Sequence, residues 1–306
     1  MKILITGGAG FVGTNLVAHL SRIGGYEITV LDNETMGKRE HLAEFGVRFI
    51  HGDIRNEADL KEALAGQQTV VHFAADTRVM DSIENPLFNF DVNVVGTFKL
   101  FNAAREAGVA SIVNASTGGA IIGEAEPPVH ELMLPNPVSP YGASKLAVEG
   151  YASAFSGSYG LNVTSLRFAN VYGTRSFHKG SVVAHFYKQI LAGKPLVVYG
   201  DGSQVRDYIF VEDLCDGIVR AIESGKSGVF QLGSGVPVSL NQLIDLMREI
   251  VGDTYPIEVA YRDARAGEIY KTWCEVSKAK QELGFAPDTP LRDGLTQTWN
   301  WFLQRA

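Results

Sequence analysis

The clearest chemical signal in the sequence is a tyrosine followed four residues later by a lysine, in Tyr141-Gly-Ala-Ser-Lys145. Residues four apart lie on one face of a helix, so the phenol and the ammonium group would meet the same ligand. A phenol has an ordinary pKa of about 10, whereas a base that works near neutral pH needs a pKa roughly 3 units lower. A nearby cation shifts the pKa in that direction. Tyr141 is therefore a candidate general base, with Lys145 as its supporting cation.

A Tyr-x-x-x-Lys spacing occurs by chance in many chains, so its value depends on its surroundings. Upstream of the pair, Ser116 and Thr117 end a stretch, Ser111–Ala115, that we predict to be a strand. Ligands of open parallel sheets bind at this end of the strands. One of the two hydroxyls is expected to share a proton with Tyr141 and a substrate hydroxyl. The alternative is a hydroxyl that bonds to its own backbone.

A glycine-rich turn near the N-terminus predicts a dinucleotide site. Gly7, Gly10 and Gly13 follow the apolar run Ile3–Ile5, and a helical pattern begins at Phe11. Gly7 permits a tight turn, Gly10 lets the backbone approach a pyrophosphate, and Gly13 lets the helix pack on the strand. The helix N-terminus favours the same anion. The spacing is G-x-x-G-x-x-G rather than G-x-G-x-x-G, and the cluster alone also fits a turn without a ligand.

Asp32 strengthens the dinucleotide interpretation. It ends a second apolar run, Ile28–Leu31, about 20 residues after the glycines, where an acid binds both ribose hydroxyls and repels a 2′-phosphate. Arg39 lies a few residues later and would suit a phosphate. We give Asp32 more weight and predict NAD as the cofactor.

Strand and helix patterns alternate through the first half of the chain. This alternation predicts an α/β fold with a doubly wound parallel (Rossmann) sheet. We expect residues 1–170 to form the NAD-binding domain, with some later strands returning to it, and residues 171–306 to form mainly a smaller, interleaved C-terminal lobe. The expected strands are Ile28–Leu31, Val47–Ile50, Thr69–Phe73 and Ser111–Ala115, and the clearest helices are Asn56–Leu64, Pro86–Ala107 and Tyr141–Tyr159.

Composition excludes several classes of partner. The 306-residue chain has a net charge of −7 and no basic block, which argues against nucleic acid and anionic membranes. No apolar run approaches the ~20 residues that a bilayer requires, and the N-terminus lacks the layout of a signal peptide. Two cysteines, Cys215 and Cys274, fit a reducing compartment. We expect a cytoplasmic protein, and we assign no metal site.

Three polar residues of the first half have competing interpretations. Asp53 follows the third strand and is expected to bind an adenine amino group, or else to cap the next helix. Asn93 lies in the long helix and is expected to bond towards the active-site strand, or else to its own backbone. His72, at the end of the fourth strand, is best interpreted as a packed core histidine.

The helices Pro86–Ala107 and Tyr141–Tyr159 also carry more apolar residues than one face needs, which predicts a homodimer.

The motifs together resemble those of one family, and the resemblance covers essentially the whole chain. They are similar to the extended short-chain dehydrogenase/reductases, and more narrowly to the NAD-dependent nucleotide-sugar epimerases and dehydratases, close to UDP-glucose 4-epimerases. No single motif is specific, but the set is. It comprises the glycine loop, Asp32, Asp53, Ser116-Thr117, Tyr141-x-x-x-Lys145, Arg167-Phe-Ala-Asn170-Val-Tyr-Gly173 and Gly200-Asp-Gly-x-x-Val-Arg206-Asp207-Tyr208.

The resemblance implies a UDP-sugar substrate bound by the C-terminal lobe. It places Asn170 and Arg206 on the diphosphate, with a surface salt bridge as the alternative for Arg206. It also places uracil against the backbone of Val182 and Val183, with the ring of Tyr199 packed on it. Arg265 would bind phosphate and Glu268, where the family has Asp, would bind ribose. The cofactor would be held by Gly7, Gly10, Phe11, Val12, Gly13, Asp32, Asn33, Asp53, Ile54, Phe73, Ala74, Ala75, Asn93, Tyr141, Lys145 and Phe168.

The implied reaction is a redox-neutral 4-epimerisation of a UDP-hexose through a 4-keto sugar. A 4,6-dehydratase of this family carries Asp-Glu directly after the active-site Thr, where this chain has Gly118-Gly119. Without that acid pair, dehydration lacks its proton carriers. The enzyme alternatives are UDP-glucuronate or UDP-N-acetylglucosamine 4-epimerisation, 4,6-dehydration and 4-keto reduction. A regulatory protein on the same fold is the alternative without catalysis.

Three departures from relatives bear on the sugar. Ile122 stands where many relatives have Tyr, so packing on the sugar ring would differ. Thr272 is small where some epimerases have a bulky aromatic residue, and would admit an N-acetyl group. The segment Arg175–Lys179 carries cations that would suit a sugar carboxylate, with a solvated loop as the alternative.

Overall fold

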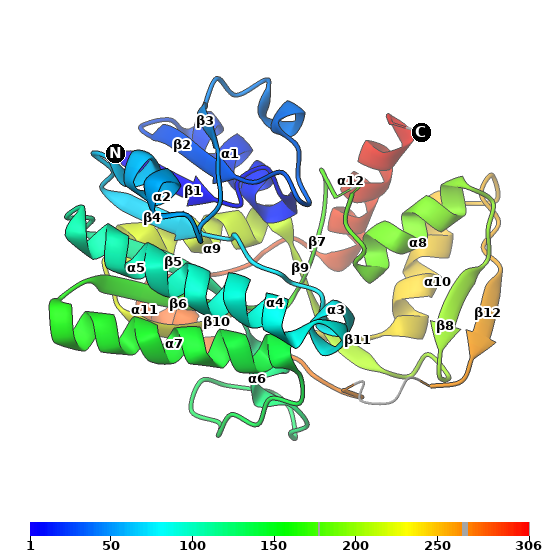
Figure 1. The fold of residues 1–306 in the computed structure, drawn as a ribbon. Helices are drawn as coiled ribbons and strands as arrows, with labels where there is room; N and C mark the ends of the chain where they lie inside the picture. Colours follow the sequence, from blue (N-terminus) through cyan, green and yellow to red (C-terminus); the bar gives the residue numbers. More distant parts are fainter. Residues whose placement is uncertain (177, 265–268, 306) are drawn as a thin grey trace.

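The computed structural model describes residues 1–176, 178–264 and 269–305. The described residues form a parallel sheet of seven strands in the order β10-β6-β5-β4-β1-β2-β3. This arrangement confirms the predicted doubly wound α/β fold (Figure 1). The strands are β1 (Lys2–Thr6), β2 (Glu27–Asp32), β3 (Arg48–His51), β4 (Thr69–His72), β5 (Ser111–Thr117), β6 (Asn162–Phe168) and β10 (Gly228–Leu232).

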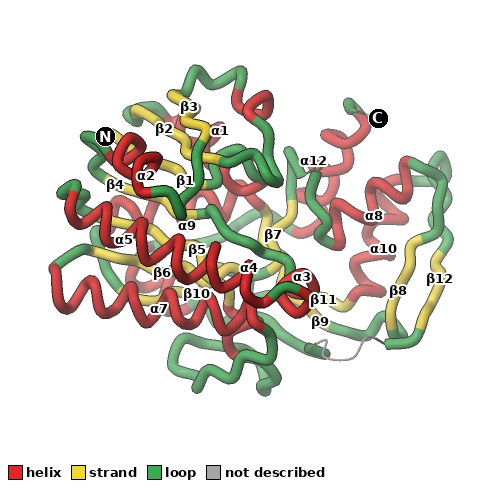
Figure 2. Tube along the Cα trace, viewed as in Figure 1, coloured by secondary structure: helices red, strands yellow, loops and turns green. Residues whose placement is uncertain are grey.

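Helices cover both faces of the sheet, as Figures 1 and 2 show. On one face lie α2 (Glu57–Leu64), α5 (Thr97–Glu106) and α7 (Pro140–Tyr159), and on the other lie α1 (Phe11–Ile23), α9 (Val211–Ser224) and α11 (Ser277–Leu283). Side chains of a strand alternate between its faces. Leu4 of β1 therefore packs in the α2–α5–α7 core, and its neighbours Ile3 and Ile5 pack in the α1–α9 core.

A second group of elements packs around its own apolar core. It contains α8 (Val182–Leu191), α10 (Leu240–Val251) and α12 (Leu291–Leu303), with β8 (Leu196–Tyr199) paired to β12 (Val259–Arg262). A small sheet of β7 (Asn170–Tyr172), β9 (Val205–Phe210) and β11 (Pro237–Ser239) lies between this group and the large sheet (Figure 1). The chain then returns, because α9, β10 and α11 belong to the large sheet although they follow β8 and β9 in sequence.

The stretch predicted as one helix over Pro86–Ala107 is divided. It contains α4 (Pro86–Phe90), the π-helical turn η2 (Asp91–Gly96) and α5. The spacing of apolar residues does not distinguish a single π-helical turn from α-helix, so the pattern predicted one continuous helix. The remaining short elements are η1 (Arg39–Leu42), α3 (Val79–Glu84) and α6 (Gly118–Ile122).

Two predictions about composition can be compared with the described part of the chain. Both cysteines, Cys215 and Cys274, are buried and free. No helix in residues 1–176, 178–264 and 269–305 combines the length and apolar character needed to cross a membrane.

His72 is a buried structural residue, as predicted. Its side chain is 1% exposed and lies between two threonine hydroxyls, with Nδ1 2.6 Å from Thr6 Oγ1 and Nε2 2.9 Å from Thr97 Oγ1. A neutral imidazole has one donor and one acceptor nitrogen, which suits two hydroxyl partners. Burial, assisted by the positive charge of Lys145, lowers the pKa of His72 to about 3. The fold therefore requires the neutral imidazole.

This requirement predicts acid sensitivity. The folded pKa of His72 lies below the ordinary value of 6.5, so its contribution to stability is complete above pH 6.5 and is lost as the pH falls towards 3. The free energy of unfolding should fall by up to about 1.4 kcal/mol per pH unit across that range. Urea unfolding at several pH values should show this slope, and His72→Gln should flatten it. His51→Gln, at an exposed histidine, is the control. An unchanged slope in His72→Gln would remove His72 as the cause.

Candidate active site

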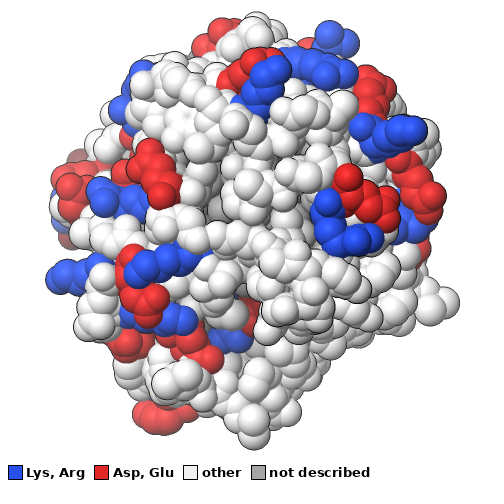
Figure 3. Space-filling view, turned by 90° about the vertical axis from the view of Figure 1, so that its left-hand side faces the viewer, with Lys and Arg blue, Asp and Glu red and all other residues white. Residues whose placement is uncertain are grey.

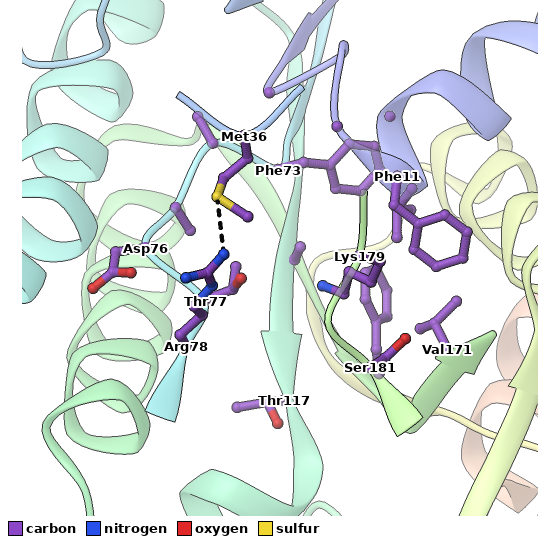
Figure 4. A pocket seen from close by; sticks show the side chains of 18 of the residues that line it. Phe11, Met36, Phe73, Asp76, Thr77, Arg78, Thr117, Val171, Lys179 and Ser181 are labelled. Atoms are coloured by element: carbon purple, nitrogen blue, oxygen red, sulfur yellow. Dashed lines mark hydrogen bonds between the residues drawn. The ribbon is translucent and has the colours of Figure 1, made fainter. Parts of the chain in front are cut away.

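A cavity of about 760 Å³ runs along the carboxyl ends of the central strands. Its wall combines the glycine loop, the ends of β2, β4 and β5, the start of α7, and residues of β7, α8 and β9. Figure 4 shows Thr117 at the end of β5, with Arg78 and Lys179 extending from opposite sides. Residues from both halves of the chain therefore face one space.

The glycine loop has the geometry of an anion cradle. Gly7 has φ +68°, and a Cβ there would lie 2.7 Å from the backbone N of Ala74. A Cβ on Gly13 would lie 2.5 Å from the carbonyl oxygen of Gly7. Only a glycine at position 13 therefore lets α1 pack this close to the loop. Gly10 is the N-cap of α1 and offers no side-chain cap to the first helical N–H groups. Those N–H groups and the helix dipole suit a pyrophosphate.

Asp32 ends β2 inside the cavity and is 7% exposed. Its carboxylate accepts hydrogen bonds from the backbone N–H groups of Ala9 (3.0 Å) and Glu34 (2.8 Å). Burial raises the pKa of Asp32, and the two N–H groups act in the opposite direction. Arg39, the residue that would favour NADP, lies over the ring of Phe49 at 5.5 Å and is not part of the cavity wall. The cradle and the acid together fit NAD.

Asp53 also lines the cavity but is already occupied by neighbours. Arg55 Nε and Nη2 donate to its two oxygens at 2.9 Å each, and Asn33 Nδ2 donates at 2.9 Å. Hydrogen bonds from Arg55 hold the pKa of Asp53 well below its usual range. The alternative of a helix cap is wrong, because Asn56 caps α2. Asn33 and Ile54 lie beside it in the wall.

Tyr141 and Lys145 lie in the first two turns of α7 and both line the cavity with Thr117. The helix starts here because Pro140 occupies its first turn and the Ser139 side chain accepts from the N–H of Gly142. The Lys145 ammonium group donates to the carbonyl oxygen of Ala115 at 2.9 Å. This bond attaches the helix to β5 two residues before Thr117.

The protein alone does not give Tyr141 the low pKa expected of a base. Burial, followed by the negative charge of Asp76, raises the pKa of Tyr141 to about 12. Burial lowers the pKa of Lys145 to about 8, and the nearby Glu149 opposes that change. The sequence argument considered the neighbouring cation and left out the desolvation of the phenolate, which acts in the opposite direction.

Two predicted site residues have other tasks in this structure. The Ser116 hydroxyl donates to Glu149 Oε1 at 2.6 Å, so Thr117 remains the hydroxyl candidate. Asn93 is buried and does not line the cavity. Its Nδ2 donates to Asp76 O (2.9 Å) and Ser144 Oγ (3.0 Å), and its Oδ1 accepts from Asp76 N (2.8 Å). Asn93 holds the loop after β4 against α7.

The predicted cofactor residues not yet described, Phe11, Val12, Phe73, Ala74, Ala75 and Phe168, all line the cavity. Of the predicted substrate residues, Asn170, Val182, Val183 and Arg206 line it as well. Tyr199 ends β8 and does not line the cavity. The wall near this end contains Gln204, Tyr208 and Leu240. Arg265 and Glu268 lie outside the described residues.

Sequence reasoning missed Asp76, Thr77 and Arg78, which line the cavity directly after Ala75. The rule that ligands bind beyond the carboxyl ends of strands would have included them, because they continue the loop after β4. Arg78 Nη2 lies 3.8 Å from Met36 Sδ, so this loop meets the loop after β2 (Figure 4).

The segment Arg175–Lys179 is divided between two roles. Arg175 pairs with Glu44 at 3.3 Å and Lys179 lines the cavity. Its neighbour Thr174 exchanges hydrogen bonds with Asn15 of α1 at 3.0 and 3.3 Å. This loop therefore fastens the C-terminal half onto the glycine-loop region.

The other two departures lie near the site without testing the sugar. Ile122 is 1% exposed in a small apolar core with Ile121 and Val129 and does not line the cavity, so its effect on sugar packing stays a prediction. Thr272 lies near Gly119, where a Cβ would be 3.5 Å from Thr272 Oγ1.

Comparisons with known proteins show the family of the chain. Residues 3–233 match the NAD dependent epimerase/dehydratase family. The UDP-glucose 4-epimerase of Mycolicibacterium smegmatis is 37% identical over 316 residues, covering 100% of both chains. The UDP-glucose 4-epimerase of Thermotoga maritima, crystallised with UDP-glucose, is 37% identical with a TM-score of 0.95 and covers 100% of this chain and 99% of its own. That of Thermus thermophilus, in complex with NAD, is 35% identical with a TM-score of 0.92 and full coverage of both chains.

Other similar proteins carry different substrate names. They include a UDP-glucuronate 4-epimerase, a UDP-N-acetylglucosamine 4-epimerase and a dTDP-glucose 4,6-dehydratase. The shared features are thus the fold, the cofactor and the nucleotide-sugar class. The chain belongs to the NAD-dependent epimerase/dehydratase family, and its cofactor is NAD.

Proposed function

We propose that this protein is a UDP-hexose 4-epimerase that interconverts the glucose and galactose forms. One observation carries the proposal. Thr117, Tyr141 and Lys145 line the same cavity as the glycine loop and Asp32, with Arg206 farther along the wall. A guanidinium group suits a diphosphate, so a nucleotide sugar anchored near Arg206 would present its sugar to Tyr141.

The proposed cycle has no net redox change. NAD⁺, held by the glycine loop and Asp32, would supply a hydride acceptor for carbon 4 and, once the 4-keto sugar has turned in the site, a hydride donor for its opposite face. Tyr141 takes the proton of the 4-hydroxyl and later gives it back, while Thr117 shares a hydrogen bond with the same oxygen. Lys145 places a positive charge beside the phenol. Because burial and the negative charge of Asp76 raise the pKa of Tyr141 to about 12, the remaining stabilisation of the phenolate must come from cationic groups of the loaded site.

The start of α6 supports epimerisation over dehydration. A side chain on Gly118 would collide with the buried side chain of Gln231. An acid at this position therefore requires Gln231 to move, and Gly119 offers no proton carrier beside it. A 4-keto sugar in this cavity lacks the acid pair that would remove a proton from carbon 5 and protonate the 6-hydroxyl.

The first prediction from this proposal concerns the reaction itself. Purified protein without added cofactor should convert UDP-glucose into UDP-galactose, with NMR resolving the products, because a redox-neutral cycle regenerates its resident cofactor. UDP-glucuronate and UDP-N-acetylglucosamine, incubated separately, identify the sugar. Turnover that requires added NAD(P)H would contradict the proposal and indicate a net reductase. A 4-keto-6-deoxy product would indicate a dehydratase.

The second prediction concerns the base. Tyr141→Phe should lower turnover by about 100- to 10,000-fold, the range typical for loss of a general acid–base, and should leave NAD bound. The absorbance of cofactor released on denaturation reports the bound NAD. Tyr187→Phe is a matched control, because it removes a buried hydroxyl, bonded to Leu295 O at 3.0 Å, from the other core. Equal turnover in both variants would remove Tyr141 from the mechanism.

We further propose a homodimer through the face formed by α4, η2, α5 and α7. A groove of about 290 Å³ between α4 and α7 is lined by Phe90, Val94, Ala143 and other small or apolar residues. Phe90 and Tyr151 remain exposed, and the two charged residues of α7, Lys145 and Glu149, are buried. On the side that Figure 3 shows, charged side chains lie around a broad uncharged area. An apolar helical face of this kind suits a second copy.

Sedimentation velocity at micromolar concentration should show a dimer. The substitution Tyr151→Glu should produce monomers, because it places a charge on the exposed apolar part of α7. Leu132→Glu, at an apolar side chain that is 92% exposed on a different loop, should leave the dimer intact. A monomeric parent protein would contradict this proposal without affecting the one on catalysis.

A further inference from the structure

A buried ion pair lies between α7 and the sheet and has no part in the cycle above. Arg167 of β6 donates to Glu149 of α7 through Nε (2.9 Å to Oε1) and Nη2 (2.7 Å to Oε2). The Ser116 hydroxyl of β5 donates to the same Oε1 at 2.6 Å. The side chains of Arg167 and Glu149 are 4% and 6% exposed. The carboxylate is thus held by three donors from two adjacent strands.

The cluster of Glu149, Arg167 and Ser116 lies next to the catalytic candidates along both α7 and β5. Glu149 follows Lys145 by four residues and Tyr141 by eight, so all three share one face of α7. On the strand side, Ser116 immediately precedes Thr117. Two contacts, Lys145 to Ala115 O and Glu149 to Ser116 Oγ, therefore join consecutive turns of the helix to consecutive residues of β5.

The cluster continues across the sheet. Ser116 is opposite Arg167 in the β5–β6 register, and Arg167 is opposite Gln231 in the β6–β10 register. Gln231 in turn lies against Gly118, which follows Thr117. The side chains of Arg167 and Gln231 therefore contact the residues before and after Thr117, which are Ser116 and Gly118. Arg167 also contacts α7, the helix that carries Tyr141, through Glu149.

Stability is a poor explanation for such a pair. Two charges lose their hydration on burial, and an apolar pair of similar volume often stabilises a protein as well or better. An ion pair with directed hydrogen bonds instead restricts geometry, since a bidentate guanidinium contact fixes both distance and orientation. Here the restricted quantity is the position of α7 along β5 and β6.

We propose that Glu149, held by Arg167 and Ser116, is a positioning residue that sets the separation between Thr117 and the Tyr141–Lys145 pair. The inference rests on the proposed function for its kinetic consequence, but its structural consequence is independent. Proton transfer requires hydrogen-bond distances, and a displacement of about 1 Å can cost 100-fold in rate. Arg206 and the glycine loop, which would hold the diphosphate of the substrate and the pyrophosphate of NAD, lie elsewhere in the wall, so binding should change much less than proton transfer.

The test uses the full-length, NAD-loaded protein. Glu149→Gln leaves the Arg167 charge buried without its partner, so the double variant Glu149→Met/Arg167→Met, which buries no charge, accompanies it. In both, kcat per NAD-bearing site should fall 10- to 100-fold, with the KM for UDP-glucose and the NAD content unchanged. If the double variant keeps kcat within twofold of the parent, the pair is merely structural and the proposal is overturned.

Ser116→Ala removes one donor and leaves the ion pair, so its kcat should fall less than that of the double variant. Ser111→Ala is the matched control, because it deletes the same group from the other end of β5, where Ser111 bonds to Thr69 at 3.0 Å. It should leave kcat unchanged. A loss in Ser116→Ala larger than in the double variant would assign the Ser116 hydroxyl to the reaction itself and overturn the positioning role.

A crystal structure of the double variant separates this proposal from the proposed function. The distance between the Tyr141 hydroxyl and Thr117 Oγ1 should differ from that in the parent crystal structure, and the contact of Lys145 with Ala115 O should be lost. Parent geometry in that crystal would overturn the positioning role whatever the enzyme turns over. A parent protein inactive on every UDP-sugar, with displaced geometry in the variant, would overturn only the proposed reaction.

Discussion

The packing of α7 on β5 and β6 is the constraint on which the rest of the site depends. A parallel sheet brings the carboxyl ends of its strands to one edge, but it does not by itself fix a helix above them. Apolar contacts of Val148 and Phe155 attach α7 to the sheet with little directional preference. The polar contacts of Lys145 and Glu149 supply the direction, and through them a tyrosine on a helix is aligned with a threonine on a strand.

Burial sets the charge states of this region before any ligand binds. It raises the pKa of Tyr141 to about 12 and lowers the pKa of His72 to about 3, so the phenol and the imidazole are neutral near pH 7, whereas Lys145, with a pKa lowered to about 8, keeps most of its positive charge there. An ionised phenol therefore depends on a positive charge delivered with the ligands.

The sequence predicted features that depend on local patterns. The glycine loop and Asp32 lie in one strand–turn–helix–strand unit, so spacing alone places them, and the alternating patterns predicted the parallel sheet. Features that depend on a choice of partner were less predictable. Ser116 lines the cavity, but its hydroxyl donates to a glutamate 33 residues away in sequence, a contact that the sequence pattern does not reveal. Asp53 lines the cavity, where its contact with adenine stays a prediction, and its hydrogen bonds with Arg55 and Asn33 are not evident from the sequence. The contacts of Asn93 depend on a π-helical turn that the periodicity of apolar residues does not reveal. The burial of Ile122 depends on a small core whose members come together only in the folded chain.

The return of the chain to the large sheet has a consequence for how this architecture can vary. Leu214 and Ile218 of α9 pack in the same core as Ile3 and Ile5 of β1, and β10 pairs with β6. A fragment ending before β7 would expose that apolar face and leave β6 with an unpaired edge. The half that binds the cofactor therefore cannot be excised or recombined as a module. Variation of the C-terminal group must arise by substitution and loop exchange within an intact chain, because segments of that group alternate in sequence with strands and helices of the large sheet.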